Sequence, residues 1–160
     1  MTTPEETPWY LDVAMPALLR HARGTYAKAI RASLADAGFD DVPANGVYVI
    51  GAIARTGAPL SQIISELGVT KQAASQLVDT LVARGYLDRS VDPVDRRRLT
   101  VALTDRGQAA ADASRSAVDS VESQLIAHVG AESVRQTRAA LATLIHIGHP
   151  EEDGQPDADD

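Results

Sequence analysis

Two sets of side chains near the middle of the chain have the chemistry to bind a polyanion. One set recurs at helical spacing: Lys71, Gln72, Ser75, Gln76 and Asp79. The other is an arginine run at 96–98, close to Arg89. Amide and hydroxyl groups pair with base edges, and guanidinium groups pair with phosphates. The pattern therefore indicates nucleic-acid recognition.

Catalytic and metal chemistry have little support in the sequence. The chain has no cysteine, which excludes a disulfide framework, a thiolate zinc site and a cysteine nucleophile. His146 and His149 have helical spacing with Glu151 nearby, but their place near the chain end favours ordinary surface residues. A turn explains the paired acids Asp92 and Asp95. With no glycine-rich phosphate loop and no pairing of a nucleophile with a base, we predict no enzyme, no cofactor and no metal site.

The first polar set falls on one face of a predicted helix over residues 71–84. The apolar residues of that helix fall on the opposite face: Ala74, Leu77, Val78, Leu81 and Val82. Thr70 is suited to cap the helix and Gly85 to end it. A short helix over 61–67, capped by Ser61, precedes it. The two helices predict a helix-turn-helix.

Alternating apolar residues after Gly85 predict a β-hairpin. Its strands are expected at 86–91 and 98–103, joined by a turn at 92–95. This hairpin carries the arginines at and just after its tip.

Longer helices are predicted on both sides of this central part. The first begins at Thr7 and Pro8 with a kink at Pro16, or else begins at Pro16, and it ends before Gly38. Further helices are expected at 44–55, at 105–129 after a Thr104 cap, and at 131–147. Their narrow apolar stripes have no obvious partner within one small chain, which favours burial against a second copy.

The predicted fold is mainly α-helical with a small β-hairpin, in the order α-α-α-α-β-β-α-α. We expect a helix for dimerisation within 1–40, a winged helix-turn-helix lobe at 41–104, and helices for dimerisation at 105–148. An acidic, disordered tail is expected at 149–160. No apolar run suits a membrane span and residues 1–8 are unlike a signal peptide, so we expect a cytoplasmic protein.

The net charge of −7 looks unsuited to a DNA-binding protein, but its distribution matters more than its total. The last ten residues hold six acidic residues and no basic ones. Without those six acidic residues the net charge becomes −1. Four basic residues lie within 89–98, where the hairpin is expected. Local charge governs phosphate binding more than the total charge does.

The central motifs resemble the MarR family of transcription regulators. The resemblance rests on a helix-turn-helix pattern over 59–78, a DPxDRR motif at 92–97 and a V-x-L-T-x-x-G motif at 101–107. It is carried by motifs over 59–107 and by helix order over about 9–147. Similarity to this family implies a homodimeric, winged helix-turn-helix regulator of double-stranded DNA, expected to be a repressor acting on a pseudo-palindromic operator.

The resemblance also implies roles for individual residues. Gln72, Ser75 and Gln76 match the helix face that enters the major groove, whereas Thr70 and Lys71 lie where a phosphate is bound. In the hairpin, Arg97 matches an arginine of the minor groove and Asp95 the acid that holds that region in shape. Arg89 and Arg96 are expected to contact the DNA backbone, and Ser61 completes the expected contacts.

Two positions depart from the family pattern. Ala73 stands where serine or threonine is frequent, so one phosphate contact is expected to be missing. Gln76 stands where arginine is common. Glutamine pairs by geometry with adenine and arginine with guanine, so we expect an A·T preference under Gln76.

Family members often bind small aromatic molecules between the dimerisation helices and the DNA-binding lobe. By position, His21, Tyr26 and Tyr48 are candidates to line such a space, although ordinary packing fits them equally well. A winged-helix module that binds a protein instead of DNA is the alternative function, and the acidic net charge slightly favours it.

Overall fold

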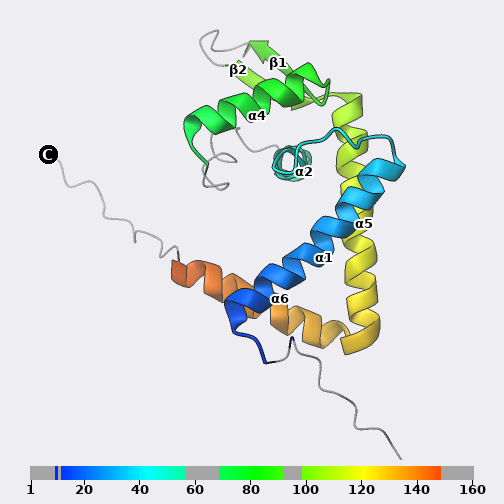
Figure 1. Cartoon of the computed structure of the whole chain (residues 1–160), viewed down its shortest axis with the longest axis vertical. Coiled ribbons are helices and arrows are strands. Elements are labelled where there is room, and N and C mark those ends of the chain that lie inside the picture. The colour runs from blue at the N-terminus through cyan, green and yellow to red at the C-terminus, as the bar shows by residue number, and fades with distance from the viewer. Residues whose placement is uncertain (1–9, 11, 57–68, 92–98, 149–160) are drawn as a thin grey trace, which may run out of the picture. The chain divides into compact units, whose positions relative to one another are not determined.

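A computed structural model describes residue 10 and residues 12–56, 69–91 and 99–148. The chain divides into two units, Met1–Asp119 and Ser120–Asp160. The helices and strands of Figure 1 are α1 (Met15–Asp36), α2 (Gly46–Thr56), α4 (Lys71–Ala83), β1 (Leu87–Val91), β2 (Leu99–Leu103), α5 (Asp105–Val129) and α6 (Ala131–Gly148). This confirms the predicted fold, mainly helical with one small hairpin. The predicted helix at 61–67, the turn at 92–95 and the tail at 149–160 lie outside the described residues.

The start of α1 settles the question posed by Pro16. Residues 12–14 are not helical, and α1 begins at Met15 with Pro16 in its first turn. Proline lacks the backbone N–H and presets a helical φ, so it suits a first turn and not a helix interior. The interpretation of a helix that starts at Thr7 and kinks at Pro16 is therefore wrong, and its alternative is confirmed.

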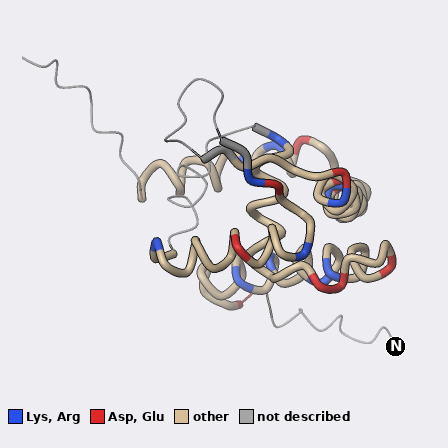
Figure 2. The backbone as a smooth tube through the Cα atoms, turned by 90° about the horizontal axis from the view of Figure 1, so that it is seen from above, with Lys and Arg blue, Asp and Glu red and all other residues tan. Residues whose placement is uncertain are grey.

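The core of the first unit forms where α1, α2 and α4 meet the hairpin and the first half of α5. Its buried members are Leu34, Val49, Ile50, Val78, Leu81, Tyr86, Leu87, Ala110 and Ala111. Val49 is fully buried although the periodicity of its helix did not place it inward. The strands pair antiparallel, with Leu87 opposite Leu103 and Val91 opposite Leu99. In Figure 2, acidic and basic residues are interspersed along the described backbone.

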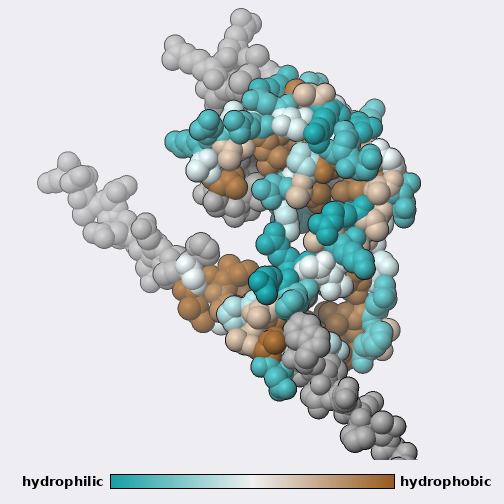
Figure 3. All heavy atoms as spheres, in the orientation of Figure 1, coloured by the Kyte–Doolittle hydropathy of each residue, from teal (hydrophilic) through white to brown (hydrophobic). Residues whose placement is uncertain are grey.

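The second unit exposes much of its apolar surface. Val134 is buried, but other apolar residues of α6 are exposed: Leu141, Leu144 and Ile145. Ile147 is 70% exposed, and Figure 3 shows hydrophobic residues gathered at the C-terminal end of α6. These residues belong to the apolar stripe that was expected to lack a partner within one chain, and no described element of the chain covers them.

Glycine ends α4 and brings Tyr86 into the core. Gly85 has a φ of 72°, a left-handed conformation that other residues adopt at a cost. The backbone N–H of Tyr86 then donates to the carbonyl of Leu81 at 2.9 Å, which closes the helix end. The Tyr86 side chain is fully buried as a result.

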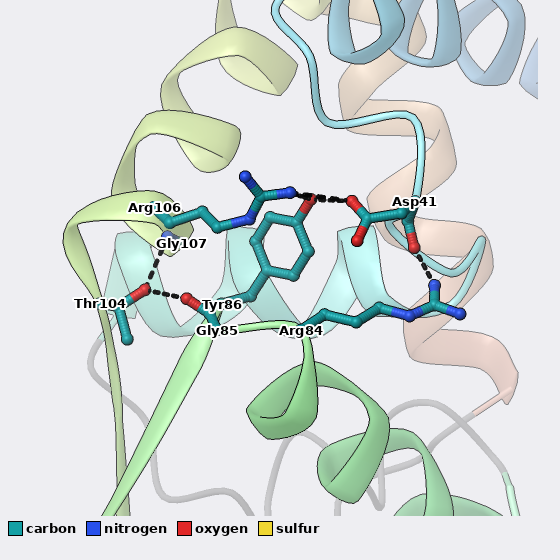
Figure 4. A network of polar contacts seen from close by, with 7 residues as sticks. All are labelled: Asp41, Arg84, Gly85, Tyr86, Thr104, Arg106 and Gly107. Carbon is teal, nitrogen blue, oxygen red and sulfur yellow. Dashed lines mark hydrogen bonds and ion pairs between the residues drawn. The ribbon is translucent and has the colours of Figure 1, made fainter.

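Tyr86 joins three segments that are distant in sequence (Figure 4). Its hydroxyl donates to a carboxylate oxygen of Asp41, in the segment between α1 and α2. Arg106, in the first turn of α5, donates to the same carboxylate oxygen at 3.0 Å and to the Tyr86 hydroxyl at 2.9 Å. The guanidinium carbon of Arg106 lies 4.6 Å from the centre of the Tyr86 ring, within cation–π range. We call Asp41, Tyr86 and Arg106 the junction.

Backbone contacts strengthen the junction on both sides. The Thr104 hydroxyl donates to the Gly85 carbonyl at 2.5 Å and accepts from the Gly107 N–H at 3.0 Å, which confirms Thr104 as a cap. A Cβ added to Gly107 would lie 2.1 Å from the Tyr86 carbonyl oxygen, so only glycine allows this close approach. Arg84 donates to the Asp41 carbonyl. The end of α4, the first strand and the start of α5 are thus fixed together.

The junction shifts the ionisation of two of its members. The hydrogen bond from the Tyr86 hydroxyl, with the charge of Arg106, holds the pKa of the Asp41 carboxyl below its usual range. Burial, followed by the hydrogen bond to Asp41, raises the pKa of Tyr86 to about 12. The neutral form of Tyr86 is therefore favoured in the folded protein.

This raised pKa predicts a loss of stability in alkali. Below about pH 10 the folded and unfolded chains both keep the Tyr86 proton, and above it only the folded chain does. The free energy of unfolding should therefore fall as pH rises from about 10 to 12. Tyr86→Phe should flatten this slope, as measured by urea unfolding at each pH. An equally steep slope in Tyr86→Phe would show that Tyr86 does not bind the linked proton.

Candidate nucleic-acid interface

Thr70 caps α4 as predicted. It has extended backbone angles, and its hydroxyl accepts the Ala73 N–H at 3.2 Å. This bond satisfies one of the free N–H groups of the first turn. The remaining N–H groups, the positive end of the helix dipole and the exposed Lys71 lie at the same end. That end of α4 is suited to an anion.

The two faces of α4 separate as the sequence predicts. Ala74, Val78 and Leu81 are buried against the core at 1% exposure or less. The polar set is exposed: Lys71, Gln72, Ser75, Gln76 and Asp79. Because the buried face fixes the rotation of the helix, the amide and hydroxyl groups of the other face are held outward. They are available to a partner along about two and a half helical turns.

The first strand of the hairpin lies beside this exposed face. Arg89, on β1, pairs with Val101 of β2 in the ladder. Its guanidinium forms an ion pair with Asp79 of α4, with 2.7 Å between Nη2 and Oδ1. The sequence placed Arg89 near DNA but did not predict its partner. No pattern in the sequence indicates this contact, because it depends on how the strand packs on the helix.

Four of the residues expected to contact DNA lie outside the described residues: Ser61, Asp95, Arg96 and Arg97. Their roles stay predictions. The described residues bring together Thr70, Lys71, Gln72, Ser75 and Gln76 on α4 with Arg89 on the neighbouring strand. The junction residues were missed, although Arg106 lies inside the V-x-L-T-x-x-G motif and so was within reach of sequence analysis.

A cavity of about 610 Å³ lies between α1, α2 and α5 in the first unit. Its lining is largely apolar: Ile30, Val47, Tyr48, Gly51, Ala52, Ala54, Arg55, Ala111, Ser114, Arg115 and Val118. Tyr48 accepts a hydrogen bond from the Arg23 side chain at 3.2 Å, and this guanidinium also approaches the Tyr48 ring. His21 and Tyr26 do not belong to the lining. Of the three predicted ligand residues, the cavity includes Tyr48.

The described residues contain no group of three histidine or acidic side chains placed to hold a metal ion. None of their helices combines the length and the apolar character needed to span a bilayer.

One family model matches part of the chain. Residues 40–98 match a model described as the MarR family. No curated protein matches the chain.

Solved structures share the fold over most of the chain. Staphylococcus aureus MepR in complex with DNA is 22% identical, with a TM-score of 0.67, over 84% of this chain and 98% of MepR. MepR in a DNA-binding conformation is 21% identical, with a TM-score of 0.68, over 83% and 97%. The transcriptional regulator Tm0710 from Thermotoga maritima is 23% identical, with a TM-score of 0.54, over 88% and 97%. The resemblance drawn from the motifs is thereby confirmed: residues 40–98 match the MarR-family model, and the chain has the fold of these solved structures.

Proposed function

We propose that the protein is a transcription regulator that binds double-stranded DNA sequence-specifically, as a homodimeric repressor in the cytoplasm. The observation that carries the proposal is the exposed polar face of α4, capped at Thr70 and flanked by a hairpin. A capped helix with outward amide groups beside a β-wing is how winged helix-turn-helix proteins read the major groove. MepR, which shares the fold, has been solved with DNA.

The charges suggest how tightly such a surface binds. Basic residues are interspersed with acidic ones, and Lys71 is the one base in the exposed polar set of α4. The described residues of each protomer then offer few phosphate contacts, which favours binding by two lobes together. Two-fold symmetry would put the recognition helices about 34–36 Å apart, which matches a pseudo-palindrome with half-sites one turn apart.

The apolar surface of the second unit supports a homodimer. Leu125, Ile126 and Val129 near the end of α5 are at least 40% exposed, as are Ile145 and Ile147 on α6. Apolar residues repeated along a helix usually pack against another chain when their own chain leaves them uncovered. A second copy is the natural partner, because a two-fold axis pairs each such surface with itself.

The cavity in the first unit supports a small effector. It lies between α2 of the DNA-binding lobe and helices α1 and α5, and its volume suits a drug-sized molecule. Arg55 and Arg115 belong to its lining, and neither has an ion-pair partner among the described residues. An aromatic acid fits this combination. It would alter DNA binding only through different affinities for the two states of the dimer.

A salt series tests DNA binding. The wild-type chain should bind random duplex with an affinity that falls steeply as salt rises, measured by fluorescence anisotropy. Binding of a partner protein is the alternative function, and it predicts no salt-sensitive binding to DNA.

On a selected site, Gln76→Ala should cost about 1–3 kcal/mol of binding free energy and abolish the preference for A·T under that residue. If the binding affinity of the wild type did not change across a series of base substitutions at that position, the role given to Gln76 would be contradicted.

Sedimentation equilibrium tests the homodimer. The wild type should have twice the mass of one chain. The double variant Leu144→Glu/Ile145→Glu should be monomeric, because it would bury two carboxylates in an apolar interface. Ser133→Glu is the control: it adds a carboxylate at an exposed position in the first turn of α6, where negative charge is tolerated. A monomeric wild type, or a dimer unaffected by the double change, would contradict the interface.

A cavity-filling variant tests the effector site. Gly51 lies on α2 in the lining, and a Cβ there meets nothing within 4 Å, so Gly51→Leu should place its side chain in the cavity. Benzoate, as a simple aromatic acid, should raise the Tm and lower the DNA affinity of the wild type, but not of Gly51→Leu. Gly24→Leu, on α1 and equally unobstructed, should respond as the wild type does. Equal responses in all three proteins would place benzoate elsewhere.

A further inference from the structure

The ion pair between α4 and the hairpin involves an arginine that is expected to contact DNA. Arg89 is a basic residue on the hairpin beside the exposed face of α4, yet its guanidinium is held by Asp79 at 2.7 Å. The side chains of Arg89 and Asp79 remain 38% and 57% exposed. A positive group placed to meet a phosphate is therefore already occupied by a carboxylate of the same chain.

The local geometry brings the two side chains together. Alternate residues of a strand share a face, so Arg89 lies on the same side of β1 as the buried Leu87. Asp79 follows Ser75 by four residues and Gln76 by three, which puts it on the exposed polar face of α4. The ion pair thus joins the end of that polar face to the middle of β1.

A phosphate and a carboxylate compete for the same guanidinium. Both are planar or forked oxygen acceptors that arginine binds with two N–H groups. An exposed ion pair is weak and is screened by salt, so its loss does not disturb the fold. As long as Asp79 holds the guanidinium of Arg89, that guanidinium is not free to bind a phosphate.

We propose that Asp79 restrains DNA binding by keeping Arg89 in an intramolecular ion pair. The proposal rests on the proposed function. Sequence-independent binding depends almost wholly on phosphate contacts. Asp79 therefore sets how strongly the chain holds DNA of any sequence, and it limits retention at unrelated sites.

The test is the affinity of Asp79→Asn for random duplex across a salt series. This change keeps the side-chain shape and releases Arg89. For each Arg89 released, the affinity should rise about threefold or more. The salt slope, which is the slope of the logarithm of the binding constant against the logarithm of the salt concentration, should steepen by about 0.9 for each released Arg89. Asp79→Asn/Arg89→Ala should lose this gain, because the coupling requires both partners. A merely structural ion pair would predict weaker binding or no change in Asp79→Asn.

Asp88→Asn is the matched control. It removes the same charge one residue from Arg89, from an exposed residue on the other side of the strand. A gain in Asp88→Asn equal to that in Asp79→Asn would show a general charge effect and overturn the proposal. So would an unchanged salt slope in Asp79→Asn. If the wild type itself shows no salt-sensitive binding, the proposed function fails as well, so the two failures are distinguishable.

Discussion

The burial of Tyr86 is the constraint from which the arrangement of the first unit follows. A fully buried phenol must pair its hydroxyl, and it does so with Asp41 and Arg106, which lie far apart in sequence. The ring fills the core while its polar end joins the segment after α1 to the first turn of α5. Tyr86 lies between the end of α4 and the start of β1. Its buried ring and its paired hydroxyl therefore fix the position from which the hairpin starts.

The core around Tyr86 also determines which surface of α4 is exposed to a partner. Ala74, Val78 and Leu81 are buried in the same core as Tyr86, so α4 cannot rotate without losing buried apolar area. Its amide and hydroxyl groups stay outward beside the hairpin. Recognition groups on a rigid helix lose little entropy on binding, which is what sequence-specific contacts require. The acidic Asp79 on this same surface tempers the attraction to phosphate.

Sequence periodicity predicted the elements well but not the contacts between them. The caps at Thr70 and Thr104, the two faces of α4 and the full extent of α5 were predicted, because each depends on neighbours a few residues apart. The junction was missed because Asp41, Tyr86 and Arg106 meet only after packing, and Tyr86 was assigned to a strand. The exposed apolar residues of α6 illustrate the same restriction. Periodicity shows that a face is apolar, but not which chain covers it.

Selection of bound sequences from a random duplex pool tests the central claim most directly. A dimer that reads DNA through α4 predicts enrichment of one pseudo-palindrome, with half-sites about one helical turn apart and positions sensitive to the residue at 76. Recovery of a pool without an enriched sequence would contradict sequence-specific recognition. An enriched site without two-fold symmetry would contradict recognition by a dimer.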